Sequence, residues 1–296
     1  MILTYLKESA TFLKRHNVPD PEISALALVS YVVKQPELNV KLNPEMILTA
    51  AQEQELESLL MKRATRYPLQ YLIKQIPFRN AILEIGEGCL IPRPETELLI
   101  DVVKSRLKRE TEPLKILEIG TGSGNIAISL ALERPHWTLM ATDISDTALE
   151  FAKKNSAFNQ TTHQIQFIKA DLYQGTGDNF DVLVSNPPYV KSSDLADAQK
   201  ELSYEPVMAL DGGEDGLSFY RRLISKVETV LKPDGFVFFE IGWDQAKQIT
   251  ELMAEKFDSI EITKDDAGHD RFISGCFAKQ PASASAFSRM TGKNHG

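Results

Sequence analysis

The sequence has few cysteines and no long apolar run. Its 296 residues include only Cys89 and Cys276, too few for a disulfide framework or a cysteine zinc site. We therefore expect a reducing, cytoplasmic compartment. The sequence has no run of about 18 apolar residues, the length that spans a bilayer. The N-terminal residues do not show a basic stretch, an apolar core and a small-residue cleavage site in that order, so we expect no signal peptide and no membrane partner.

Positive charge is also scarce. Lys and Arg number 33 against 41 Asp and Glu, which gives a net charge of -8. Residues 1–90 hold ten of each sign, so the acidic excess lies in residues 91–296. An acidic region argues against binding along a phosphate backbone, which requires basic surface. We expect a monomer with no direct nucleic-acid partner and, since no ligand spacing surrounds His269, no metal.

The composition is typical of a globular protein, with 43% hydrophobic and 25% charged residues. The length of the chain is typical of two domains. Residues 1–75 place apolar side chains at helical spacing and show no strand pattern, which predicts a small helical bundle. Its expected helices cover 2–13, 23–33, about 44–66 and 69–73. In residues 76–92 apolar side chains surround Gly86 and Gly88, which predicts a β-hairpin linking two domains.

Residues 93–279 are expected to form the second domain. Strand patterns occur at 114–119, 137–142, 164–169, 182–185, 236–241, 259–263 and 271–277. Helix patterns alternate with them at 123–134, 145–158, 215–231 and 243–256. This alternation predicts a doubly wound, mostly parallel, seven-stranded α/β sheet with its ligand at the carboxyl ends of the strands. Trp243 and residues 236–239 are expected in the core, and 280–296 as a disordered tail.

A glycine-rich loop follows the first of these strands, in the sequence Glu118-Ile119-Gly120-Thr121-Gly122-Ser123-Gly124. Glycines between a strand and a helix let a ligand approach the backbone closely. No Lys-Ser/Thr pair follows, so the loop is not a P-loop. The alternative is a tight turn without a ligand. The order Glu-x-Gly-x-Gly-x-Gly favours S-adenosylmethionine over a dinucleotide, and in it the chain resembles the class I, Rossmann-like methyltransferases.

Two acidic residues end the next two strands. Asp143 lies about 20 residues beyond the glycines, where a carboxylate can accept both ribose hydroxyls. Asp171 can accept a hydrogen bond from an adenine amino group, and Leu172 can pack on the ring. The alternative is that each Asp caps a helix or turn, as Asp often does. Three strand ends in order, each with a suitable group, favour a cofactor site.

The fourth strand ends in Ser185-Asn186-Pro187-Pro188-Tyr189, the most informative segment. Two prolines restrict φ and remove two backbone donors, which leaves the Asn186 side-chain oxygen and the Pro187 carbonyl as acceptors for an NH2 group. Tyr189 offers a flat face for a planar amide or base. Two acceptors would hold a poorly nucleophilic nitrogen in line with a sulfonium methyl group and favour the charge developing on it. The alternative is a rigid Pro-Pro loop.

Further segments resemble the release factor glutamine methyltransferases. The strongest is Leu90-Ile91-Pro92-Arg93-Pro94-Glu95-Thr96-Glu97, and others are Pro68-Leu69-Gln70-Tyr71-Leu72, Tyr204-Glu205-Pro206, Ala209–Leu217, Leu231-Lys232-Pro233-Asp234-Gly235 and Glu240-Ile241-Gly242. The resemblance implies N5-methylation of the glutamine in the Gly-Gly-Gln motif of peptide chain release factors, with S-adenosylhomocysteine as the second product. It implies that the helical bundle and the hairpin recognise the release factor.

Carried over position by position, the resemblance assigns site residues. Those that contact S-adenosylmethionine are Gly120, Thr121, Gly122, Ser123, Gly124, Asp143, Asp171, Leu172 and Asn186. Those that hold the glutamine are Asn186, Pro187, Pro188 and Tyr189, with Asn186, Pro187 and Tyr189 as the catalytic group. Arg93 and Glu97 either contact substrate or form a linker salt bridge, and Glu205 either lines the pocket or begins a turn.

Two other functions are the alternatives to methylation of a release factor. One is a nucleic-acid adenine or guanine methyltransferase, and the other is a non-catalytic protein that docks on the translation machinery.

Overall fold

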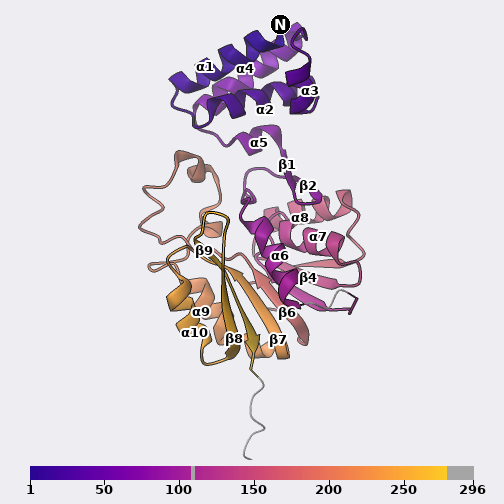
Figure 1. Ribbon diagram of the computed structural model, residues 1–296, viewed down its shortest axis with the longest axis vertical. Coiled ribbons are helices and arrows are strands. Elements are labelled where there is room, and N and C mark those ends of the chain that lie inside the picture. The colour runs from indigo at the N-terminus through magenta and orange to yellow at the C-terminus, as the bar shows by residue number, and fades with distance from the viewer. Residues whose placement is uncertain (108–110, 279–296) are drawn as a thin grey trace, which may run out of the picture.

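A helical part stands above an α/β part in the computed structural model, which describes residues 1–107 and 111–278 (Figure 1). The helical part contains α1 (Ile2–Arg15), α2 (Pro21–Val33), α3 (Glu37–Leu42), α4 (Ala50–Ala64) and the short α5 (Leu69–Ile73). Helix α2 is the central one, because it packs against α1, α3, α4 and α5. The predicted tail at 280–296 lies outside the described residues.

The prediction of one helix over about 44–66 was wrong in its extent. Helix α4 begins after Thr49, whose hydroxyl accepts the backbone N–H of Gln52 while the Gln52 side chain accepts the Thr49 N–H. This reciprocal capping box satisfies amide groups that the first turn would leave open, and so sets the start of the helix. Helix α3 was not predicted, since six residues are too few to show a helical period.

A hairpin is present but is shorter than the predicted 76–92. Strand β1 (Gln75–Phe78) pairs antiparallel with β2 (Ala81–Glu84), and residues 85–92, with Gly86 and Gly88, follow the hairpin without strand structure. The hairpin is held to the α/β part by Asn155 of α8 (Asp146–Phe158). The Asn155 side chain accepts the Glu84 N–H at 2.6 Å and donates to the carbonyls of Glu84 and Ser123, both at 2.9 Å. One buried amide thus connects the hairpin to the glycine-rich loop.

The doubly wound, mostly parallel sheet of seven strands is confirmed. Its strands are β3 (Lys115–Ile119), β4 (Thr138–Asp143), β5 (Ile165–Lys169), β6 (Phe180–Ser185), β7 (Leu231–Glu240), β8 (Phe257–Lys264) and β9 (Asp270–Phe277). They lie in the order β5-β4-β3-β6-β7-β9-β8. All neighbours are parallel except β9, which runs antiparallel to β7 and β8.

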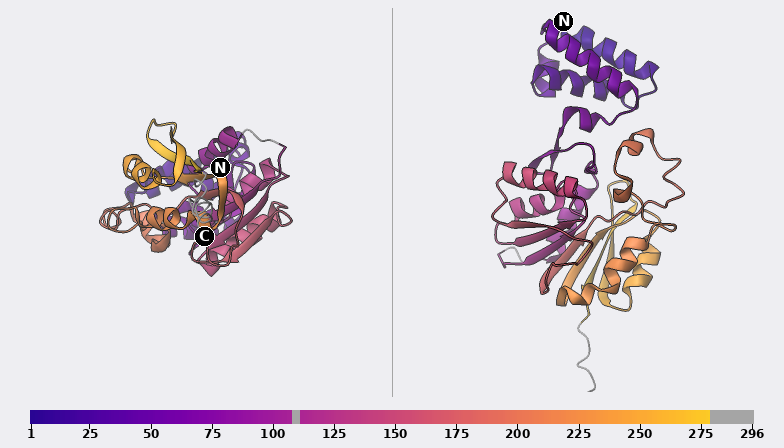
Figure 2. Two further views of the ribbon diagram at one scale, coloured as in Figure 1. Left: turned by 90° about the horizontal axis from the view of Figure 1, so that it is seen from below. Right: turned by 180° about the vertical axis from the view of Figure 1, so that it is seen from behind.

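Helices cover both faces of this sheet. One group of helices is α6 (Thr96–Leu107), α7 (Asn125–Glu133) and α8, and the other is α9 (Ser218–Ser225) and α10 (Ala246–Met253). Figure 2 shows the two groups separated by the sheet. Alternate residues of one strand point to opposite faces, and the packing follows this rule. In β3, Ile116 belongs to the core that contains α6 and α7, whereas Leu117 belongs to the core that contains α9 and α10.

The strand order places the site. The chain winds outward from β3 through β4 to β5, then returns to the other side of β3 as β6. At this switch point Ile119 and Ser185 are register partners, and the Ser185 hydroxyl donates to the Ile119 carbonyl at 2.7 Å. Gly120 and Asn186 each follow one residue later, so two motifs far apart in sequence emerge side by side where such sheets bind ligands.

Candidate active site

The glycine-rich loop forms one wall of a cavity of about 220 Å³. Gly120 and Gly122 line it with φ values of +74° and +54°, in the left-handed region that favours glycine. A Cβ atom at either position would meet no atom within 4 Å. Open space therefore lies directly over the backbone, as the close approach of a cofactor requires. Thr121, Ser123 and Gly124 are buried, and their cofactor contacts stay a prediction.

The Glu118 side chain holds the glycine-rich loop in place through hydrogen bonds. It is fully buried, and its Oε2 accepts the Thr121 hydroxyl at 2.8 Å and the Ala127 N–H at 3.1 Å. Burial raises the pKa of Glu118 to about 8. One side chain thus links β3, the loop and the first turn of α7.

Asp143 lies opposite Gly122 in the same cavity. Its Oδ2 accepts the Gly122 N–H and its Oδ1 accepts the Ser145 N–H, both at 2.9 Å. Burial raises the pKa of the Asp143 carboxyl, and these backbone donors oppose the shift. Helix α8 is capped by Ser145, whose hydroxyl accepts the Ala148 N–H. Asp143 is therefore not the cap of this helix, but it accepts the N–H two residues further on, as an Asx turn does. The turn role is present, and the contact with the ribose stays a prediction.

Asp171 and Leu172 also line this cavity. Arg222 of α9 donates to both carboxylate oxygens of Asp171, at 2.6 and 2.7 Å, and each oxygen retains a lone pair for a further donor. Leu172 has a φ of +54°, an unusual conformation for a bulky residue that tends to mark functional sites. Phe219 and Arg222 line the same cavity, and neither was identified from sequence.

Asn186 stands where two cavities meet. It lines the cavity beside the glycine-rich loop and also a larger one of about 560 Å³, as does Pro188. Pro187 and Tyr189 line the larger cavity alone. The Asn186 side chain donates through Nδ2 to the Thr96 hydroxyl at 3.1 Å, so its Oδ1 points elsewhere.

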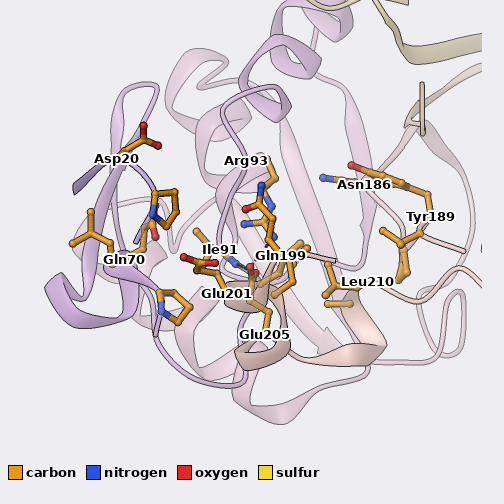
Figure 3. Close-up of a pocket in the computed structure, with 18 of the residues that line it drawn as sticks. Asp20, Gln70, Ile91, Arg93, Asn186, Tyr189, Gln199, Glu201, Glu205 and Leu210 are labelled. Atoms are coloured by element: carbon orange, nitrogen blue, oxygen red, sulfur yellow. Dashed lines mark hydrogen bonds and ion pairs between the residues drawn. The ribbon is translucent and has the colours of Figure 1, made fainter. Parts of the chain in front are cut away.

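The larger cavity lies between the sheet and the helical bundle. Figure 3 shows Asn186 and Tyr189 on one side of it and Asp20 and Gln70 of the bundle region on the other. The segment between β6 and α9 reaches up towards the bundle (Figure 1). Within it, Glu201 of the 3-10 helix η1 (Lys200–Tyr204) pairs with Arg63 at 3.1 Å and Arg66 at 2.6 Å. None of these three residues was identified from sequence.

Arg93 and Glu205 form one ion pair with each other. Arg93 Nη2 lies 2.7 Å from Glu205 Oε1, and Glu205 Oε2 accepts the Ile91 N–H at 2.9 Å. Glu205 is buried, and both Arg93 and Glu205 line the larger cavity. The pair holds the segment after the hairpin against the segment after Tyr189. Glu97 lies in the first turn of α6, and its backbone carbonyl accepts a hydrogen bond from Arg79 at 2.9 Å.

One core prediction was wrong. Trp243 is 66% exposed, whereas Phe238 and Phe239 are fully buried as expected. Trp243 follows the end of β7 in the loop before α10 and contacts the ring of His269, with centroids 6.4 Å apart. Hydrophobic character could not reveal this position, because a loop residue beyond a strand end need not point into either core.

The fold and the site define a class I methyltransferase. Residues 94–211 match the family Methyltransferase small domain, and residues 4–73 match the PrmC N-terminal domain. The fold is similar to a crystal structure of a methyltransferase from Pyrococcus furiosus, which is 21% identical, with a TM-score of 0.50 over 67% of this chain and 89% of that chain.

Relatives of higher identity narrow this class. The chain is 39% identical over 235 residues to the release factor glutamine methyltransferase of Thermodesulfovibrio yellowstonii, covering 78% of this chain and 83% of the relative. It is 32% identical over 293 residues to the release factor glutamine methyltransferase of Fusobacterium nucleatum, covering 97% and 81%. The chain belongs to the release factor glutamine methyltransferase family, which confirms the resemblance seen in its motifs.

Two kinds of feature are absent from the described residues. Across 1–107 and 111–278, no helix combines the length and apolarity that a membrane crossing requires. In the same part of the chain, no three His, Cys, Asp or Glu side chains are grouped as metal ligands. The expectation that the enzyme uses no metal stays a prediction.

Proposed function

We propose that this protein transfers the methyl group of S-adenosylmethionine to N5 of the glutamine in the Gly-Gly-Gln motif of a peptide chain release factor. S-adenosylhomocysteine is then the second product. The observation that carries the proposal is the position of Asn186 at the junction of the two cavities. One cavity has the groups that suit the cofactor, and the other has the size and position that suit a substrate side chain.

The smaller cavity fits S-adenosylmethionine in its chemistry. The open space over Gly120 and Gly122 lets part of the cofactor lie directly against the backbone. The Asp143 oxygens offer acceptors for ribose hydroxyls, and Asp171 with Leu172 offers an acceptor and an apolar surface for adenine. When bound, the cofactor supplies an electrophilic methyl group on a sulfonium.

The tetrapeptide from Asn186 to Tyr189 orients the glutamine amide. Oδ1 of Asn186 and the Pro187 carbonyl accept its two N–H groups, and Tyr189 packs against its plane. The nitrogen would gain the methyl group as its bond to sulfur breaks, and one of the two nitrogen protons would pass to water. Acceptors at fixed positions favour this step because they stabilise positive charge as it develops on the nitrogen.

The larger cavity supports a protein substrate. Its walls come from both the sheet ends and the helical bundle, so a loop entering it would contact both parts. We assign recognition of the release factor body to the bundle and the hairpin. The two cysteines are both free, which supports a reducing, cytoplasmic compartment.

Mass spectrometry of a release factor incubated with this protein and S-adenosylmethionine tests the function. The expected result is a gain of one methylene mass on the peptide with the Gly-Gly-Gln motif, located to the glutamine by fragmentation. A release factor whose motif glutamine is replaced by alanine is the matched control. Transfer to nucleic acid and not to the release factor would overturn the proposal.

A further inference from the structure

A chain of buried hydrogen bonds lies behind Asn186. The Asn186 amide donates to the Thr96 hydroxyl at 3.1 Å, and that hydroxyl donates to Oε2 of Glu240 at 2.6 Å. Thr96 is fully buried and Glu240 is 1% exposed. Thr96 begins α6 and Glu240 ends β7, so three distant segments meet at this point. Both residues lie in motifs to which the proposed chemistry assigns no role.

The hydroxyl of Thr96 has one proton, and this decides how the amide of Asn186 is turned. An ionised Glu240 only accepts hydrogen bonds, so the hydroxyl proton must point at it. The Thr96 oxygen can then only accept from Asn186, which places NH2 towards Thr96 and leaves Oδ1 for the substrate. A protonated Glu240 can donate to Thr96 instead, which frees the hydroxyl proton for Oδ1 and lets the amide turn over.

We propose that Thr96 and Glu240 are positioning residues that hold the Asn186 amide with its oxygen available to the substrate nitrogen. The proposal rests on the proposed function and deepens it. A glutamine amide offers N–H groups, so an Asn186 turned the other way would present donors to donors. Neither Thr96 nor Glu240 lines either cavity. Thr96 therefore acts through Asn186, and Glu240 acts through Thr96 and through the Tyr189 hydroxyl that donates to it.

Several groups face Glu240 and decide its charge. Burial raises the pKa of Glu240 to about 7, and Glu95 adds to the rise, whereas Thr96, Arg271 of β9 and the Tyr189 hydroxyl lower it. The Tyr189 hydroxyl lies 3.5 Å from Oε1 of Glu240. Tyr220 of α9 donates to the backbone carbonyl of Glu240 at 2.7 Å and not to its carboxylate. Protonation near neutral pH is therefore expected to loosen the amide.

Variants of the full-length chain test this by single-turnover methylation of a release factor with saturating cofactor. Thr96→Val keeps the shape and removes the hydroxyl, and we expect a rate loss on the order of 10–100-fold, as for a misplaced catalytic group. Thr96→Ser keeps the hydroxyl and should retain most of the rate. Thr161→Val is the matched control, because Thr161 is equally buried and precedes the start of β5. Calorimetry should give similar cofactor affinities for all four proteins.

The pH dependence separates positioning from packing. The wild-type rate should fall as pH drops through about 7, where Glu240 gains a proton. In Glu240→Gln this inflection should disappear and the rate should be low throughout, since the new amide can donate to Thr96. A Glu240→Gln variant that retains the wild-type inflection would overturn the role of Glu240.

An NMR measurement keeps the proposal testable without activity. In asparagine-labelled protein, with the Asn186 side-chain signals assigned by their loss in Asn186→Ala, one amide proton should be protected from exchange in the wild type and in Thr96→Ser. Protection should be lost in Thr96→Val. Unchanged protection, or a wild-type rate in Thr96→Val, would overturn the proposal. Protection as expected with no methylation of the release factor would overturn the proposed function alone.

Discussion

The two walls of the larger cavity are held in different ways. The wall with Asn186 and Tyr189 follows directly from a sheet strand and is braced by buried hydrogen bonds to Thr96 and Glu240. The opposite wall comes from the helical bundle, whose polar attachments to the segment after Tyr189 include the ion pairs of Glu201 with Arg63 and Arg66. The difference fits the proposed roles, in which the sheet wall carries the chemical step and the bundle recognises the release factor.

Removing the acceptor at the sheet wall should have the largest effect. Asn186→Ala deletes a group expected to stabilise the developing charge, so we expect single-turnover methylation to slow by about 10²–10³-fold. Cofactor affinity should fall only modestly, because the loop around Gly120 and Gly122 is untouched. A wild-type single-turnover rate would show that Asn186 is only a turn residue.

The next effect concerns the cofactor cavity. Asp143→Ala removes a carboxylate expected to accept ribose hydroxyls, which should weaken binding of S-adenosylmethionine by about 1.5–3 kcal/mol. Titration calorimetry measures this directly. Asp146→Ala is the matched control, since Asp146 lies three residues further on with a 70% exposed side chain. Equal dissociation constants for the two variants would remove Asp143 from the site.

The wall on the bundle side should respond differently. Glu201→Ala leaves Arg63, whose side chain is only 5% exposed, without its carboxylate partner. We expect KM for the release factor to rise on the order of tenfold, equivalent to about 1.4 kcal/mol, with kcat and cofactor affinity nearly unchanged. Asp197→Ala, an exposed acid on the same segment, is the control. A fall in kcat at constant KM would mean that both walls serve the chemical step.

The smallest effect on activity is expected at Glu118, where pH acts on stability. The folded protein retains a proton on Glu118 up to about pH 8, whereas the unfolded chain releases it near its ordinary pKa of 4.5. The folded state binds more protons in this window, so the free energy of unfolding should decrease as pH rises through it. Glu118→Gln abolishes this titration and should flatten the dependence in urea unfolding series. Parallel pH profiles for the two proteins would contradict the assignment.

The periodic spacing of apolar residues was sufficient to predict those helices and strands that show such spacing. The short helix at Leu69–Ile73 was predicted with its observed bounds, and the strand at 164–169 differs from β5 by one residue. Helix α3 and the start of α4 were missed because a six-residue helix and a capping box leave almost no periodic signal. The helix expected at 215–231 is shorter, and α9 ends at Ser225 before the 3-10 turn η3 (Val227–Thr229).

The amino-acid sequence by itself determined the chemistry of this protein. The glycine-rich loop, the acids after the next two strands and the Asn-Pro-Pro-Tyr segment can be identified from short stretches, because each is a local solution to turn geometry and hydrogen bonding. Only the tertiary structure decided which residues stand behind them. Thr96 is 144 residues from Glu240 and 90 residues from Asn186, and it is hydrogen-bonded to both. Parallel strands joined by crossovers bring such distant positions together, and no local sequence pattern indicates it.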